Sequence, residues 1–351
     1  MQTINCQDYA IHIGSIEQSL ANFLQGRDYS SVAVVVDENT RRHCLPLILD
    51  VLDSKHLTIV EVPAGESFKN IETCTLIWKK LLMAGFDRNS LVVNLGGGVI
   101  GDMGGFCASS YMRGIDFLQI PTTLLAQVDA SVGGKLGVDL EMVKNIVGFF
   151  NNPKAVLVDP NFLKTLSSRE VLSGYAEVVK HALIADSVMW NKSILLGLDP
   201  HKINSDQLSR SIQVKRNIVE QDPFEKGLRK ILNFGHTVGH AVETVSWETK
   251  NPLLHGEAIF VGMICETYLA YAKNLISMDL CDAVCRVLKG IFYRKDAVSS
   301  TEEIFQIMLK DKKNRRQEIR AALINGIGSA KYDVILTREE VSESFQYYKK
   351  L

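Results

Sequence analysis

The 351-residue sequence lacks the features that mark secreted and membrane proteins. Its seven cysteines include no C-x-x-C pair and no disulfide-like spacing. Cys281 and Cys285, four apart in a helical pattern, are therefore expected to be buried thiols in a reducing cytosol. The amino-terminal segment has no basic stretch followed by an apolar one, so we expect no signal peptide. No apolar run is long enough to cross a bilayer.

An excess of charge of either sign is also missing. The formal net charge is −1, and the basic residues are spread along the chain. This balance gives no reason to expect a nucleic acid or an anionic membrane as a partner. Apolar residues make up 46 % and charged residues 23 %, which is ordinary for a soluble globular protein. At this length, two domains are expected rather than one.

The pattern of apolar residues changes near residue 160. Before it, short β-branched runs predict strands at 31–36, 57–62, 90–95, 117–120 and 155–158, with a helix over 70–84. Such alternation favours a mostly parallel, buried sheet. After it, helical patterns cover 168–190, 205–221, 234–247, 255–275, 278–292 and 301–311. The sequence therefore predicts an α/β protein, with a Rossmann-like domain over 1–160 and an all-helical domain over 161–351. The motifs described next make the first the dinucleotide-binding domain and the second the metal- and substrate-binding domain.

A glycine cluster follows the third predicted strand. Gly96-Gly-Gly-Val-Ile-Gly101 fits G-x-G-x-x-G, in which glycines let the backbone approach a pyrophosphate at the start of a helix. A tight turn is the simpler alternative, but the preceding strand favours the dinucleotide. The best acid for the ribose, Asp37, ends a strand before the loop, whereas Asp116 has the usual spacing but begins a strand. We therefore expect unusual connectivity, with Asp37 on the ribose.

Two further stretches could bind anions. Gly133-Gly134-Lys135 could form a phosphate nest, or Lys135 could be a solvated loop residue. Arg229 and Asn233 are four apart and lead toward His236, so a helix would place the guanidinium beside that histidine, where it could clamp a carboxylate or phosphate. Most of the charge run at 311–316 is expected to be solvated.

Three histidines and a glutamate suggest a metal site. His236 and His240 share one helical face, His255 follows, and Glu177 lies far upstream. Imidazoles and a carboxylate suit a catalytic zinc that keeps one position open for substrate. A histidine pair at this spacing is also common on surfaces and in cores. The chain has no H-E-x-x-H, which disfavours a metalloprotease.

Six blocks in the same order together resemble the 3-dehydroquinate synthase family. They are Gly96 to Gly105, Gln119 to Asp129, Ser131 to Lys135, Glu177 to Lys180, Leu232 to His240, and His255 to Glu257. The resemblance runs from about residue 30 to Asn314. Leu136 stands where threonine is common, His181 where tyrosine is common, and the stretch from His240 to His255 is slightly longer than usual. None of these departures touches a residue assigned below.

The resemblance implies a role for particular residues. It makes Glu177, His236 and His255 the ligands of zinc (or cobalt), and it makes His240 a non-ligand that handles protons and the substrate phosphate. This revises the interpretation of His236 and His240 as two ligands. It places in the substrate pocket Asp129, Lys135, Lys144, Asn145, Lys180, Lys215, Arg229, Asn233 and Lys312. Arg113 resembles an arginine that reaches a neighbouring subunit's phosphate site. The implied NAD contacts are Asp37, Glu66, Lys69, Gly97, Gly98, Val99, Asp102, Thr122, Thr123, Lys135 and Lys144, with Phe162 and Thr165 nearby.

The implied reaction converts 3-deoxy-D-arabino-heptulosonate 7-phosphate to 3-dehydroquinate and phosphate in the shikimate pathway. It proceeds by transient oxidation with NAD, phosphate elimination, re-reduction and aldol closure. A cytoplasmic homodimer is expected. Three alternatives stay open: a sister sugar phosphate cyclase acting on a substrate without a carboxylate, a metal-dependent polyol or glycerol dehydrogenase, and a non-catalytic protein with a structural metal. Lys215 and Arg229 favour an acidic substrate.

Overall fold

The computed structural model describes residues 1–52, 56–141, 143–195, 203–310 and 318–351. The chain divides into two compact units, Met1–Ser167 and Ser168–Leu351. The sequence pattern changes near residue 160, and the 3-10 helix that follows, Pro160–Thr165, lies with the first unit. Each unit is described by itself below.

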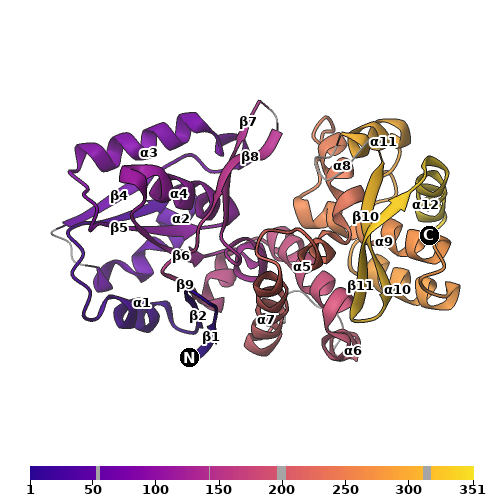
Figure 1. Ribbon diagram of the computed structural model, residues 1–351, viewed down its shortest axis with the longest axis horizontal. Helices are drawn as coiled ribbons and strands as arrows, with labels where there is room; N and C mark the ends of the chain where they lie inside the picture. The colour runs from indigo at the N-terminus through magenta and orange to yellow at the C-terminus, as the bar shows by residue number, and fades with distance from the viewer. Residues whose placement is uncertain (53–55, 142, 196–202, 311–317) are drawn as a thin grey trace. The chain divides into compact units, whose positions relative to one another are not determined.

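A seven-stranded sheet forms the centre of the first unit (Figure 1). Its strand order is β1-β2-β9-β6-β5-β3-β4, and every pair except β1–β2 at one edge is parallel. The mostly parallel sheet predicted from the β-branched runs is thereby confirmed. The strands are β1 Gln2–Asn5, β2 Ala10–Ile13, β3 Val32–Val36, β4 Leu57–Glu61, β5 Leu91–Gly96, β6 Asp116–Pro121 and β9 Ala155–Val158.

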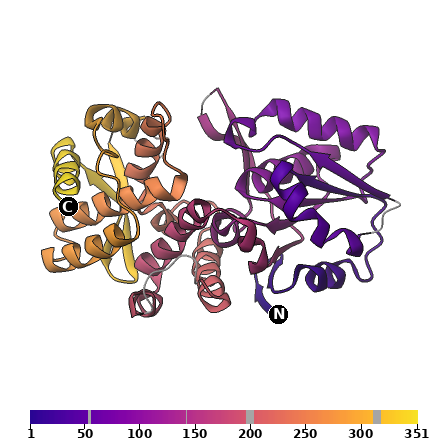
Figure 2. The same cartoon turned by 180° about the vertical axis from the view of Figure 1, so that it is seen from behind.

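Both faces of this sheet are covered, because successive side chains of a strand point to opposite sides. Val35 and Val92 pack with α3 and α4 in one apolar cluster. Val34 and Val93 pack with α1 in the other. Figure 2 shows the same unit from behind. The helices of this unit are α1 Ile16–Leu24, α2 Glu38–His43, α3 Ile71–Met83 and α4 Gly98–Ser110.

An antiparallel hairpin follows β6 in the first unit. A π-helix, Ala126–Ala130, leads into β7 (Lys135–Leu140), which pairs with β8 (Val143–Phe150). Most side chains of β8 are exposed or only partly buried, so the strand lacks the apolar alternation by which strands are recognised in a sequence. The hairpin was therefore not predicted.

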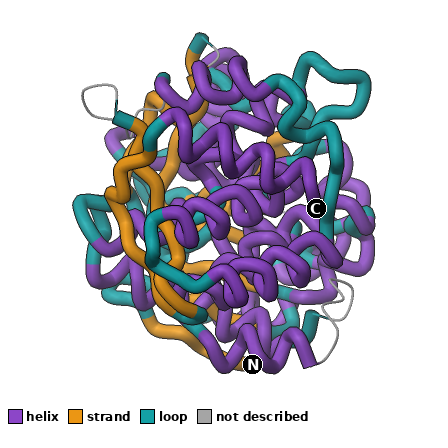
Figure 3. Tube along the Cα trace, turned by 90° about the vertical axis from the view of Figure 1, so that its right-hand side faces the viewer, coloured by secondary structure: helices purple, strands orange, loops and turns teal. Residues whose placement is uncertain are grey.

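The second unit is helical, as expected, but it is not all-helical. Figure 3 looks onto this part of the chain, in which purple helices predominate. A hairpin of β10 (Ile319–Gly326) and β11 (Ser329–Leu336) packs against α9 and α5. Its connection uses two glycines with positive φ, Gly326 and Gly328. The helices are α5 Ser168–Ala185, α6 Ser187–Leu195, α7 Ser205–Gln221, α8 His236–Ser246, α9 His255–Ala272, α10 Met278–Ile291, α11 Thr301–Leu309 and α12 Arg338–Lys350.

Two properties expected from the composition recur in the structure. Cys281 and Cys285 are free thiols with no exposed surface. Within the described residues, the helices are all too short or too polar to cross a membrane.

Candidate metal and dinucleotide sites

The glycine cluster lies at the carboxyl end of β5 and opens α4. A Cβ on Gly96 would lie 2.5 Å from the Ile100 Cβ, and one on Gly104 would lie 2.0 Å from the Asn94 Oδ1. Side chains at these positions would therefore force the strand and the helix apart. Gly97 is the residue before the first turn of α4, whose backbone N–H groups have no partner within the helix. This loop can take a pyrophosphate at the positive end of α4.

Other polar side chains follow the ends of neighbouring parallel strands. Asp37 follows β3, which lies beside β5, and its Oδ1 accepts from the Thr40 backbone N–H at 2.8 Å. Thr122 follows β6, and its N–H donates to Gly96 O at 3.0 Å. Asp116 begins β6, so it lies at the opposite edge, where its Oδ2 accepts from the Tyr29 hydroxyl at 3.1 Å. Of the two acids, only Asp37 lies at the edge where dinucleotides bind in such folds.

A buried lysine links three segments of the first unit. Lys69, 4 % exposed, donates to Asp102 Oδ2 on α4 and to Asn145 Oδ1 on β8, both at 2.6 Å. Burial works to lower the pKa of Lys69, but the negative charges of Asp102 and Glu66 outweigh it and raise the pKa above its ordinary value. The ammonium group is therefore charged and fixed beside the start of α4.

The remaining candidates of the first unit are more scattered. Phe162 is buried in the 3-10 helix that follows β9, and the Thr165 hydroxyl donates to its carbonyl at 3.2 Å. Asp129 is partly buried in the π-helix, and Lys135 is exposed at the start of β7. Arg113 is exposed, with a positive φ of 70°, which is uncommon for a residue other than glycine.

Three potential metal ligands converge in the second unit. Glu177 lies on α5 with no exposed surface, His236 is the first residue of α8, and His255 is the first residue of α9. Glu177 Oε1 lies 3.5 Å from His236 Nε2 and 3.8 Å from His255 Nε2. Tetrahedral ligands about 2.1 Å from one zinc ion stand roughly 3.4 Å apart. These three atoms therefore fit around a single ion.

The hydrogen bonds of the other ring nitrogen, Nδ1, in His236 and His255 agree with this fit. His236 Nδ1 lies 3.1 Å from Phe234 O, and His255 Nδ1 lies 3.2 Å from Glu243 Oε2. A carbonyl and a carboxylate can only accept, so each neutral ring carries its proton on Nδ1 and leaves the Nε2 lone pair for a metal. On Glu177, the second oxygen contacts the buried Lys180 ammonium group.

His240 lies close enough to be an alternative ligand. Nitrogen atoms of His236, His240 and His255 lie within 4.8 Å of one another. The His240 ring centroid is 5.0 Å from that of His236 and 5.6 Å from that of His255. Distances alone therefore allow a three-imidazole site as well as the site that includes Glu177.

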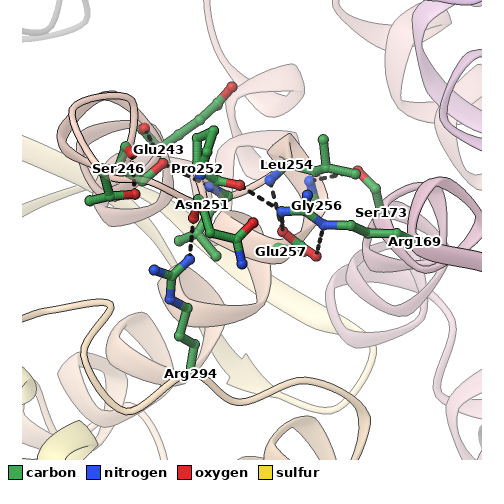
Figure 4. Close-up of polar contacts among 12 residues, drawn as sticks. Arg169, Ser173, Glu243, Ser246, Asn251, Pro252, Leu254, Gly256, Glu257 and Arg294 are labelled. Carbon is green, nitrogen blue, oxygen red and sulfur yellow. Dashed lines mark hydrogen bonds and ion pairs between the residues drawn. The ribbon is translucent and has the colours of Figure 1, made fainter.

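The start of α9 is held by a dense set of polar contacts (Figure 4). Arg169 donates from Nε and Nη2 to the two oxygens of Glu257, each at 2.7 Å, and Glu257 Oε2 also accepts from Leu254 N–H at 2.8 Å. The Gly256 N–H donates to Ser173 Oγ at 2.9 Å, which ties α9 to α5. These bonds fix the backbone of His255. The sequence patterns gave Arg169, Ser173 and Glu243 no role.

Protons compete with the metal for the His255 ring, so the affinity for the metal should depend on pH. Burial works to lower the pKa of His255, but its bonds to Glu177 and Glu243 outweigh this and raise it to about 9 in the metal-free protein. Because a metal needs the neutral ring, the apparent zinc affinity should rise about tenfold per pH unit from about pH 7 and level off above the pKa of His255. Competition with a chelator at several pH values measures this. An affinity that does not change between neutral pH and that pKa would contradict it.

The raised pKa of His255 should make the metal-free fold less stable as the pH rises, whereas the affinity for zinc rises with pH. A raised histidine pKa stabilises the folded state fully below its ordinary value of 6.5, and this contribution is lost as the pH rises through about 9.

The helical alignment expected for Arg229, Asn233 and His236 is wrong. Leu228–Asn233 is a 3-10 helix, and α8 begins only after Gly235, whose φ is +81°. A Cβ on Gly235 would lie 2.6 Å from the Met263 side chain, so α9 packs too closely against this turn for a side chain at that position. The three residues therefore lie on two elements with different axes, and their spacing does not place them on one face.

The cations and amides of the second unit can still be placed one by one. Arg229, 2 % exposed, donates from Nη1 to Pro223 O at 2.5 Å. Asn233 donates to Glu225 Oε1 at 2.6 Å, and Lys215 is buried on α7. Lys312 lies outside the described residues.

Models of two adjoining families match the chain. The amino-terminal 3-dehydroquinate synthase model matches residues 59–173, and the carboxyl-terminal one matches residues 174–314. A 3-dehydroquinate synthase from Parabacteroides distasonis is 37 % identical over 341 residues, covering 95 % of this chain and 96 % of the relative. One from Campylobacter concisus is 39 % identical over 349 residues, covering 97 % and 96 %.

Solved structures agree on the fold. A 2-epi-5-epi-valiolone synthase from Streptomyces hygroscopicus with bound NAD+ and Zn2+ has a TM-score of 0.83 at 25 % identity, covering 100 % of this chain and 99 % of its own. A 2-deoxy-scyllo-inosose synthase complexed with carbaglucose-6-phosphate, NAD+ and Co2+ has a TM-score of 0.84 at 23 % identity, covering 99 % of each chain. With both family models matched in order and relatives similar along nearly the whole length, the chain belongs to the 3-dehydroquinate synthase family.

Proposed function

We infer that the protein is a carbon–oxygen lyase that converts 3-deoxy-D-arabino-heptulosonate 7-phosphate to 3-dehydroquinate and phosphate. The observation that carries this inference is the similarity to 3-dehydroquinate synthases over 95 % of the chain. The donor set described above agrees with it, since a dinucleotide loop and a buried carboxylate–histidine cluster occur in one chain. When bound, zinc or cobalt supplies a Lewis acid, and NAD accepts and returns a hydride.

Glu177, His236 and His255 are the proposed metal ligands. Their converging atoms and the Nδ1 partners of both rings support this set. Lys180 neutralises Glu177 in the absence of metal and can bind an anionic substrate group in its presence. His240 is proposed to move protons at the substrate phosphate, because its ring lies beside the rings of both histidine ligands.

The cofactor contacts are proposed for the edge of the sheet where β3, β5 and β6 end. Gly97 and Gly98 would approach the pyrophosphate, and the Asp37 carboxylate, which caps the start of α2 at the end of β3, would bind the ribose. Lys69 and Asp102 form a fixed charged pair beside them. The other proposed contacts are Glu66, Val99, Thr122, Thr123, Lys135, Lys144, Phe162 and Thr165.

The proposed substrate residues supply positive charge and hydrogen bonds. Arg229 and Lys215 are buried cations suited to the substrate carboxylate. Asn233 ends the 3-10 helix that also carries Arg229. Positioning a substrate by such groups can contribute several kcal/mol, up to about 10. The remaining residues proposed to contact substrate are Asp129, Lys135, Lys144, Asn145, Lys180 and Lys312.

A cytoplasmic homodimer is proposed as the working form. Arg113 supports the dimer, because it is exposed and therefore available to a second subunit. In a dimer, it would reach the phosphate site of the other subunit.

Substrate choice tests the proposed reaction. Purified protein with zinc and NAD should convert heptulosonate 7-phosphate to a carbocyclic acid identified as 3-dehydroquinate by NMR. It should act at least about tenfold more slowly on sugar phosphates that lack the carboxylate, because buried cations would be left without their anion. Equal or faster turnover of a neutral sugar phosphate would favour a sister cyclase instead.

A further inference from the structure

Each of the two histidine ligands opens a helix, and each helix start is held by a carboxylate from the other helix. His255 is the first residue of α9, and its Nδ1 donates to Glu243 on α8 at 3.2 Å. Glu266 on α9 accepts from Gly235 N–H at 2.6 Å and from Val238 N–H at 2.9 Å, at the start of α8. Each helix therefore supplies a carboxylate that accepts hydrogen bonds from the first residues of the other.

Glu266 acts on His236 through the backbone. It has no exposed surface, and its two oxygens bind N–H groups that the first turn of α8 cannot satisfy itself. A negative charge there also interacts favourably with the helix dipole. The turn that Glu266 fixes contains Gly235 in its left-handed conformation, with Phe234 before it and His236 after it. Phe234 O is the acceptor that orients the His236 ring.

Glu243 acts on His255 directly. Its carboxylate is the acceptor for Nδ1, and only 7 % of the residue is exposed. The Ser246 hydroxyl donates to the Glu243 carbonyl at 2.7 Å and accepts from Leu253 N–H at 3.0 Å, as Figure 4 shows around Glu243 and Ser246. The end of α8 and the approach to α9 are thereby joined beside the ligand.

We propose that Glu243 and Glu266 are reciprocal positioning residues for the metal site: α8 holds the ligand of α9 in place, and α9 holds the ligand of α8. Neither carboxylate is a ligand, and neither contacts substrate in this scheme. Their effect is to keep the two Nε2 atoms converged on Glu177 before the metal arrives. This inference rests on the metal site proposed above.

Zinc affinity, rather than turnover, is the measurement. Competition with a chromophoric chelator at one fixed pH should show that Glu243→Ala raises the zinc Kd about 10- to 100-fold. Glu243→Gln should recover most of the affinity, because its amide oxygen still accepts from Nδ1. The melting temperature of the metal-free Glu243 variants should stay within a few degrees of wild type.

Glu266→Gln keeps one acceptor of two, and it should raise the zinc Kd about tenfold. Thr267→Val is the matched control, because Thr267 is the next residue on α9 and is equally buried, and its hydroxyl donates within α9 to Met263 O at 2.6 Å. It should lower the melting temperature without changing the zinc Kd. Should Glu266→Gln not fold, the two Glu243 variants decide the matter.

The outcomes separate this inference from the metal site itself. Zinc Kd values within about twofold of wild type for Glu243→Ala and Glu266→Gln would overturn the positioning role, as would an equal loss in Thr267→Val. Failure of the wild-type protein to bind zinc would instead reject the proposed ligands.

Discussion

Replacing His236 or His255 with alanine is expected to strip the bound zinc and to lower kcat/KM by about three orders of magnitude or more. Each change removes one of the two imidazole nitrogens that lie 3.5 and 3.8 Å from Glu177 Oε1. A Lewis acid contributes several kcal/mol to the transition state, and about 4 kcal/mol corresponds to a thousandfold in rate. Metal content after dialysis and the rate of phosphate release measure the two effects separately.

His240→Ala decides between the two possible ligand sets. Its ring lies about as close to His236 and His255 as they lie to each other. If Glu177 completes the site, His240→Ala should retain zinc and lose rate, because a proton-transferring group contributes about 10²- to 10⁴-fold. Loss of zinc in His240→Ala as complete as in His236→Ala would make His240 a ligand and contradict the proposed ligand set.

Arg229→Lys is expected to lower kcat/KM for the acidic substrate by about one to two orders of magnitude. The substitution keeps the charge but loses the planar fork that binds a carboxylate through two parallel hydrogen bonds. A charged, buried hydrogen bond of this kind contributes roughly 1.5–3 kcal/mol. Zinc content and NAD affinity should stay near wild type, because Arg229 is proposed to contact neither.

Arg210→Lys is the matched control for this prediction. Arg210 is a partly exposed arginine of α7 paired with Asp186 at 3.3 Å, and such pairs contribute little. Its kcat/KM should be unchanged. The discriminating comparison is between the acidic substrate and an analogue without the carboxylate. Equal turnover of both by the wild-type protein would show that Arg229 does not recognise a carboxylate.

The parts of the fold that could be predicted are those in which neighbouring residues share the same degree of burial, because this leaves a regular pattern in the sequence. The strands around Val34 and Val93 are buried on both faces, so they appear in the sequence as continuous β-branched runs. Gly96 and Gly104 are required by the close approach of Ile100 and Asn94. Asp37 lies at the end of β3, as its place after a β-branched run indicated, and its contact with the ribose stays a prediction.

Contacts between distant segments could not be predicted in the same way. The turn at Gly235 depends on Met263 of another helix, so the sequence around Arg229 and His236 resembles one continuous helix. Glu243 and Glu266 are ordinary helical glutamates by spacing, and only the packing of α8 on α9 shows what they hold. The β10–β11 hairpin was missed because helical patterns surround it on both sides.

The zinc-loaded protein, given less NAD than heptulosonate 7-phosphate, should release phosphate until the substrate is exhausted. NADH absorbance should not accumulate, because the hydride returns within each turnover, and omission of NAD should stop the release. This result would show that the dinucleotide acts as a recycled cofactor in a lyase reaction. NADH that accumulates in step with substrate consumed would contradict the inferred reaction and identify a metal-dependent dehydrogenase instead.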